Sequence, residues 1–201
     1  MYKFFIFFNN IIGDYMYYIS NFLLFSILGH LLESFIYLIM DSHNYSGIMY
    51  GPWTPVYGFG IIIIIVIYNF IKKRNINNIS KVISIFLLSM VFLTFIEYIG
   101  GNLIEYFFHK KFWNYENLRF NIGSYIALEI AFVWGICSLI YIYILKPVTD
   151  KMVKKIPNYI FICILVFFII DFVVTVINNL KWIFLLFFLI LHLDFLLIYS
   201  R

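Results

Sequence analysis

Six long apolar stretches separated by short polar connections constrain this chain more than any other feature. Each approaches the ~20 residues that an α-helix needs to cross the hydrocarbon core of a bilayer. Hydrophobic residues make up 64% of the sequence and charged residues 12%, against about half and about a quarter in a soluble domain. We therefore predict an all-α, polytopic transmembrane helical bundle that forms a single integral membrane domain over residues 1–201. The stretches cover about 17–40, 53–71, 82–107, 124–145, 158–177 and 182–199.

The last two stretches are separated only by residues 178–181. This short polar segment predicts a tight hairpin and hence six spans. The alternative is one span followed by a re-entrant helix, which would give five.

Basic residues are concentrated in two connections, whereas the connection over 41–52 contains none. Cytoplasmic loops of membrane proteins carry an excess of Lys and Arg. A cytoplasmic N-terminus places ten basic residues inside and four outside, so we predict both termini inside and a multi-pass protein of the cell membrane. This distribution accounts for the net charge of +4 without a nucleic-acid partner. The two basic groups are Lys72, Lys73, Arg74 and Lys81, and Lys146, Lys151, Lys154 and Lys155.

Several function classes find no support in the sequence. No Gly-x-x-x-x-Gly-Lys-Ser/Thr phosphate loop occurs, so an ATPase would have to be a separate subunit. Cys137 and Cys163 lie in apolar stretches, where cysteine behaves as a small hydrophobic residue. No metal-ligand spacing and no cofactor motif is found, and we expect a protein that is not itself an enzyme.

Acidic residues in or beside the apolar stretches are the informative exception. A charged group at the bilayer centre costs at least a few kcal/mol, and the four stretches concerned contain no Lys or Arg. The carboxyl groups are therefore protonated, bind a cation, or meet Arg119 or Lys110–Lys111 from a loop that folds back. The predicted topology places them in the outer half of the membrane, where they would form a polar acidic cavity. With a nearby histidine, the candidates for substrate or ion binding are His30, Glu33, Glu97, Glu105, Glu129 and Asp171.

Helical spacing aligns several of these residues. One face of the first stretch carries polar groups, and a face of the third does the same. Interhelical hydrogen bonding would explain such stripes without any function. His30 and Glu33 are spaced to offer two metal ligands, which is half a site. The two stripes are Ser26, His30, Glu33 and Tyr37, and Thr94, Glu97, Gly101 and Glu105.

Two connections on the predicted outer side are rich in aromatic residues. The sequence Gly-Pro-Trp-Thr-Pro-Val-Tyr at 51–57 suits a rigid entry into the bilayer, with proline at a helix start and aromatic residues at the interface. The connection before the fourth stretch is expected to lie on or dip into the membrane and cap the acidic site. The candidate loop residues are Pro52, Trp53, Pro55, Tyr57, Trp113, Tyr115, Arg119 and Asn121.

The order of these motifs resembles the ABC transporter permease family of type IV, also called CmpB-like, over about residues 20–175. The resemblance rests on Gly-x-x-x-Glu at 29–33, Gly-Pro-x-x-Pro-x-Tyr-Gly-x-Gly at 51–60, Thr-x-x-Glu-Tyr at 94–98 and Trp-x-Tyr at 113–115. His30 and Asn114 depart from the tryptophan and the acidic residue of the family pattern. The resemblance implies a membrane protein of the permease class.

Three functions remain open at this level. The first is a permease-like subunit of a transport system, whose acidic cavity binds a proton, a cation or a cationic solute and which works with a separate ATPase. The second is an intramembrane enzyme acting on a lipid or lipid-linked substrate, with His30, Glu33 and Glu97 as an acid–base set. The third is a structural assembly partner in which the acids only join helices.

Overall fold

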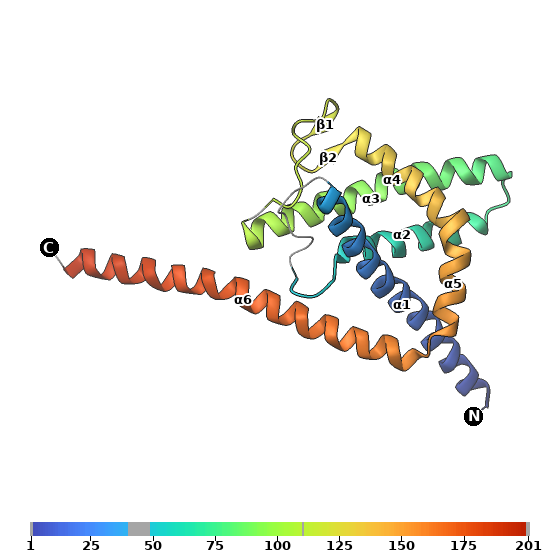
Figure 1. Cartoon of the computed structure of the whole chain (residues 1–201), viewed down its shortest axis with the longest axis horizontal. Coiled ribbons are helices and arrows are strands. Elements are labelled where there is room, and N and C mark those ends of the chain that lie inside the picture. Colours follow the sequence, from blue (N-terminus) through green and yellow to red (C-terminus); the bar gives the residue numbers. More distant parts are fainter. Residues whose placement is uncertain (1, 40–48, 110, 200–201) are drawn as a thin grey trace.

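Most of the residues that the structure describes are helical. The computed structural model describes residues 2–39, 49–109 and 111–199, and the side chains of 13–39, 49–109 and 111–179. The only sheet among these residues is a hairpin of β1 (Asn121–Ile122) and β2 (Ile126–Ala127) (Figure 1). The helices are α1 (Tyr2–Ile39), α2 (Pro55–Lys72), α3 (Asn78–Phe108), α4 (Leu128–Ile140), the π-helical turn η1 (Tyr141–Leu145), α5 (Lys146–Lys155) and α6 (Asn158–Tyr199).

Five helical segments in the described residues are long and apolar enough to cross a membrane. Their outward surfaces are covered by large apolar side chains such as Phe35, Val91 and Phe167, which suits contact with lipid rather than water. The predicted all-α transmembrane class is confirmed. The count of six spans and the orientation of the N-terminus stay predictions. The segments are Gly13–Ile39, Pro55–Lys72, Asn78–Phe108, Leu128–Lys155 and Asn158–Asn179.

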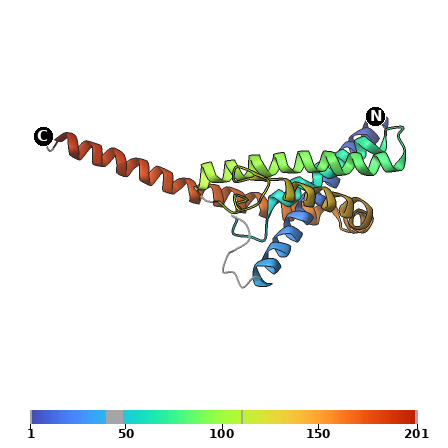
Figure 2. The same cartoon turned by 90° about the horizontal axis from the view of Figure 1, so that it is seen from above.

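The predicted turn at residues 178–181 is wrong, because α6 runs through this segment as one helix of 42 residues. The segment contains no Gly or Pro to end a helix, and the Asn179 side chain donates to the Thr175 carbonyl one turn earlier, at 2.8 Å. At 1.5 Å per residue, α6 is about 63 Å long, roughly twice the hydrocarbon thickness. Its C-terminal part extends well beyond the other helices (Figures 1 and 2).

Two boundaries of the fourth predicted span also differ. Residues 124–127 belong to the β-hairpin, because Gly123 adopts a φ of +64° that turns the chain and pairs Asn121 with Ala127. At the other end, the predicted loop over 146–157 is mostly the helix α5. Pro147 lies in the first turn of α5, and the preceding turn widens into η1, where the Lys146 N–H bonds to the Tyr141 carbonyl. π-Helical structure occurs mostly as single turns of this kind inside longer helices.

The helices pack in chain order, α1 on α2, α2 on α3 and α3 on α4. A core of buried side chains, including Phe25, Ile65, Ile85 and Tyr141, joins these helices. Close approach of α1 and α2 requires Gly58, because a Cβ there would collide with Ser26 and with the Phe22 carbonyl.

The two ends of the bundle differ in composition. The loop end carries residues 49–54 and the connection over 111–127. The basic end carries the start of α1, the C-terminus of α2 and α5, and it brings together the two basic connections noted in the sequence.

Candidate functional site

The Glu97 carboxylate on α3 is the main buried acidic group toward the loop end. Only 5% of the residue is exposed. Its Oε1 accepts a hydrogen bond from the Tyr115 hydroxyl in the connection before β1, and its Oε2 accepts one from Trp134 Nε1 on α4 at 2.8 Å. Both donors are neutral, so Glu97 is held by hydrogen bonds rather than by an ion pair within the described side chains.

A second carboxylate approaches from α1. The Tyr57 hydroxyl on α2 hydrogen-bonds to Glu33 and also lies within electrostatic reach of Glu97. The Tyr57 ring packs edge-on against Trp134, with 6.3 Å between centroids. Gly29 permits this placement, since a Cβ there would overlap the Tyr57 ring. We name the group formed by these residues the carboxylate centre: Glu33, Tyr57, Glu97, Tyr115 and Trp134.

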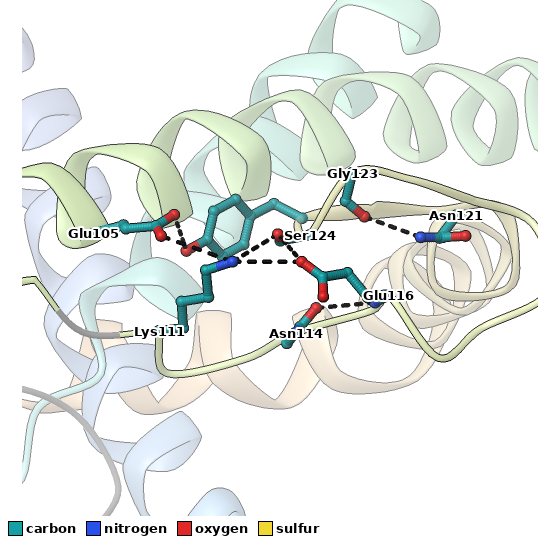
Figure 3. A network of polar contacts seen from close by, with 8 residues as sticks. Glu105, Lys111, Asn114, Glu116, Asn121, Gly123 and Ser124 are labelled. Carbon is teal, nitrogen blue, oxygen red and sulfur yellow. Dashed lines mark hydrogen bonds and ion pairs between the residues drawn. The ribbon is translucent and has the colours of Figure 1, made fainter.

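A second polar network joins the C-terminal part of α3 to the connection at the loop end (Figure 3). Lys111 Nζ lies 2.9 Å from Ser124 Oγ, 3.4 Å from Glu116 Oε1 and 3.7 Å from Glu105 Oε1. Ser124 Oγ donates to Glu116 at 2.5 Å, and the Tyr125 hydroxyl donates to Glu105 Oε2 at 2.8 Å. The folded-back connection thus supplies Lys111, one of the cations anticipated from the sequence. We name Glu105, Lys111, Glu116, Ser124 and Tyr125 the loop clamp.

The loop clamp is joined directly to the carboxylate centre through the backbone. Tyr115 N donates to the Ser124 carbonyl at 2.9 Å, beside the Ser124 side chain that belongs to the clamp. A Cβ on Gly101 would lie 2.5 Å from the Tyr125 ring, so this glycine on α3 lets the hairpin settle against the helix. Movement of the connection would therefore move Tyr115 away from Glu97.

The electrostatics of the connection keep its tyrosines neutral and its glutamate charged. Burial, followed by the charge of Glu97 and the hydrogen bond to it, raises the pKa of Tyr115 above its ordinary value. Burial and the hydrogen bond to Glu105 raise the pKa of Tyr125 to about 12. Hydrogen bonds from Ser124, Asn114 and Lys111 lower the pKa of Glu116. Tyr115 is therefore a permanent donor to Glu97 near neutral pH.

Asp171 lies on α6 and contacts the connection before α2 rather than the carboxylate centre. Its carboxylate accepts hydrogen bonds from Gly51 N at 2.8 Å and Tyr50 N at 3.2 Å. Trp53 is buried and packs edge-on against the Phe168 ring, with 5.5 Å between centroids. These contacts tie the connection before α2 to α6.

The proline residues of this connection have separate positions. Pro55 is the first residue of α2, where its missing N–H costs no hydrogen bond. Pro52 is exposed at the surface.

The remaining candidates lie outside the carboxylate centre. Glu129, in the first turn of α4, accepts from Phe120 N at 3.2 Å. Arg119 is exposed and lies over the Phe120 ring at 5.3 Å, and Asn121 donates to the Gly123 carbonyl within the hairpin. Trp113 packs edge-on against Tyr125. These residues shape the loop end.

His30 is half-buried on α1, and its Nδ1 has no hydrogen-bond partner among the described residues. Within the same part of the chain, no three His, Cys, Asp or Glu side chains are grouped as a metal site would require.

Two functional residues were not predicted from the sequence. Trp134 donates a hydrogen bond to Glu97, and Tyr125 donates one to Glu105. Trp134 lies inside an apolar stretch rather than at a membrane interface, where tryptophan is usually found. A tryptophan within an apolar stretch could therefore have been predicted as a hydrogen-bond donor inside the bundle. Tyr125 carried no comparable signal, because its contact depends on how the hairpin folds onto α3.

Long apolar helices with a polar centre between them define a polytopic α-helical membrane protein. The family model described as "Putative ABC-transporter type IV" matches residues 20–176, more than three quarters of the chain. The chain belongs to this family, and it is a multi-pass membrane protein associated with transport. Comparisons with curated proteins and with solved structures gave no match.

Proposed function

We propose that this chain is a permease-like subunit of a transport system in the cell membrane, and that the carboxylate centre binds a proton or a cation, including a cationic solute, during transport. The observation that carries the proposal is the Glu97 carboxylate, buried on α3 and held by two neutral donors. A carboxylate removed from water is stabilised when it takes up a proton or a cation. Such intramembrane acids are typical of ion and solute pathways.

The arrangement of the centre also suits a step that opens and closes. Its side chains come from α1, α2, α3, α4 and one connection, so a shift between helices changes the surroundings of the carboxylate. Tyr115 reaches Glu97 from the connection that the loop clamp holds in place. In the proposed cycle, release of the loop clamp withdraws Tyr115 and gives the transported cation access to Glu97 from the loop end.

The energy source in this proposal is a separate ATPase subunit. The family relationship to ABC transporters favours such a partner. We propose that it docks at the basic end on the surface of α5, where Lys151 and Lys155 are exposed. Affinity purification of the tagged chain from its own membranes should recover an ATP-hydrolysing protein, and repeated recovery of the chain without one would contradict this part of the proposal.

The test of the carboxylate centre compares Glu97→Gln with wild type and with Glu97→Asp. Gln preserves the size and the acceptor oxygen of the side chain but cannot ionise, whereas Asp keeps the ionisable group. Purified proteins would be unfolded by heat in detergent at several pH values, with sodium, potassium or tetramethylammonium chloride added. A ligand that binds only the folded state raises its unfolding temperature.

The expected result is a wild-type unfolding temperature that depends on pH or on one of these cations, a dependence lost in Glu97→Gln and retained in Glu97→Asp. In cells, Glu97→Gln should be as abundant as wild type but inactive. Equal responses of wild type and Glu97→Gln, together with full cellular activity, would show that Glu97 only packs helices and would overturn the proposal.

A further inference from the structure

The basic end contains an open cleft of about 760 Å³. Three separate elements form it: the start of α1, the C-terminus of α2 and the helix α5. A volume of this size is in the range of small-ligand sites. The lining side chains are Asp14, Tyr17, Tyr18, Asn69, Lys72, Lys73, Lys146, Asp150 and Lys154.

The charges around the cleft are unbalanced. Four lysines and two aspartates line it. Lys146 Nζ is paired with Asp150 at 2.6 Å, whereas Lys72, Lys73 and Lys154 form no ion pair with any side chain that the structure describes. Lys72 and Lys146 both lie within 6 Å of the centre of the Tyr68 ring. Positive charges that line one cleft repel each other, and an anion bound in the cleft would offset this repulsion.

One wall of the cleft is fixed by hydrogen bonds. The Tyr17 hydroxyl donates to Asp150 Oδ1 at 2.8 Å, while Lys146 occupies the other oxygen of the same carboxylate. Lys146 also lies over the Tyr17 ring at 5.5 Å. These contacts join α1 to α5 and hold this wall of the cleft in one arrangement, which lowers the ordering cost of binding.

The position of the cleft identifies the class of anion. It lies where apolar helices end, which is the level of lipid headgroups, and tyrosines are typical of this interface. Basic pockets between transmembrane helices are suited to phosphate-bearing headgroups. We infer that the cleft binds the phosphate headgroup of an anionic phospholipid, with Lys72, Lys73 and Lys154 as its principal contacts.

The experiment measures lipid binding by native mass spectrometry of the purified full-length chain. Dioleoyl phosphatidylglycerol is added as the anionic probe and dioleoyl phosphatidylcholine as the zwitterionic one. Wild type should bind phosphatidylglycerol at least tenfold more tightly than phosphatidylcholine. The triple variant K72Q/K73Q/K154Q should lose at least tenfold in affinity for phosphatidylglycerol, because three of the cationic contacts are removed.

Matched variants separate a site from general surface charge. The control R74Q/K151Q/K155Q removes three positive charges at the same end from residues that do not line the cleft, and its affinity should stay within twofold of wild type. The conservative K72R/K73R/K154R should retain binding within about threefold, which shows that the loss in the Gln variant is not a folding defect. Equal losses in the cleft and control variants would overturn the inference, as would equal wild-type affinities for the two lipids.

Competition with inorganic phosphate distinguishes a lipid headgroup from free phosphate as the ligand of the cleft. Because a lipid also gains from its acyl chains, millimolar phosphate should leave phosphatidylglycerol bound. Displacement of the lipid by phosphate at this concentration would overturn a lipid ligand in favour of the free anion.

Discussion

At the loop end the bundle buries a carboxylate among neutral hydrogen-bond donors, whereas at the basic end it leaves lysines around an open cleft. Glu97 is 5% exposed, and its donors come from a connection and from α4. The side chains of Lys146 and Asp150 are 16% and 29% exposed, and they sit four residues apart on one helix. Removing a partner of a buried charge is costly because the geometry of several elements holds it, whereas a partly exposed ion pair contributes less because solvent screens it.

The largest expected loss of stability comes from removing the buried carboxylate at the loop end, compared with removing a partly exposed one at the basic end. Glu97→Ala leaves the Tyr115 hydroxyl and Trp134 Nε1 without their acceptor, and it should lower the free energy of unfolding by about 2–4 kcal/mol. Asp150→Ala removes a partly exposed contact to Tyr17 and Lys146 and should cost about 0.5–1 kcal/mol. Thermal unfolding in the same detergent measures both. Equal decreases in the free energy of unfolding for Glu97→Ala and Asp150→Ala would contradict the difference between the two ends.

The next largest loss of stability is expected from adding one methyl group at the loop end, with the same addition at the basic end for comparison. Gly101→Ala places a Cβ 2.5 Å from the Tyr125 ring and should destabilise the protein by about 1–3 kcal/mol through overpacking. Gly13→Ala at the basic end meets nothing within 4 Å and should stabilise α1 by up to about 1 kcal/mol through helix propensity.

The neighbouring glycine of α3 provides the control for this comparison. Gly100 also has open space around its Cβ position, so Gly100→Ala should not destabilise. The measurement is the unfolding temperature of Gly101→Ala, Gly13→Ala and Gly100→Ala, each compared with wild type. If Gly101→Ala were as stable as Gly100→Ala, the hairpin would not be packed tightly on α3.

The smallest expected effect is an acid dependence that arises from Glu116 at the loop end. The pKa of Glu116 is lowered in the folded protein by hydrogen bonds from Ser124, Asn114 and Lys111. A lowered pKa means that the folded state binds its proton later than the unfolded state does. The contribution of Glu116 is therefore present above its ordinary pKa and is lost as the pH falls through its lowered value.

Unfolding temperatures of wild type and Glu116→Gln, measured from pH 6 to pH 3, test this sign. Wild type should lose more stability on acidification than the variant, because Gln does not titrate. Parallel curves for the two proteins would exclude Glu116 as a source of the acid dependence.

The sequence was sufficient for most of the fold, since long apolar runs leave few alternatives to helices in a membrane. It was insufficient where a boundary depends on local geometry. The segment at 178–181 is polar enough to suggest a turn but continues as helix, and the predicted connection over 146–157 is mostly the helix α5, which follows the π-helical turn η1. Polarity alone does not determine whether a helix ends.

For the site, periodicity predicted which faces of α1 and α3 are polar, and the structure directs both toward neighbouring helices and the hairpin. Periodicity does not predict which donor reaches which carboxylate. The pairing of Glu97 with Trp134 depends on the rotation of α4 relative to α3, and that of Glu105 with Tyr125 depends on closure of the hairpin. Whether these residues bind a transported ligand stays a prediction.

The contact of Asp171 with the backbone of Tyr50 and Gly51 also bears on how the protein is made. The contact joins residues 121 and 120 positions apart in the chain, and the family match ends at residue 176, shortly after Asp171. At about 5–20 residues per second, the ribosome adds Asp171 roughly 6 to 24 seconds after it has added Tyr50 and Gly51. During biogenesis the connection before α2 therefore lacks these hydrogen bonds at first. They form only after the N-terminal part of α6, which contains Asp171, has entered the bilayer.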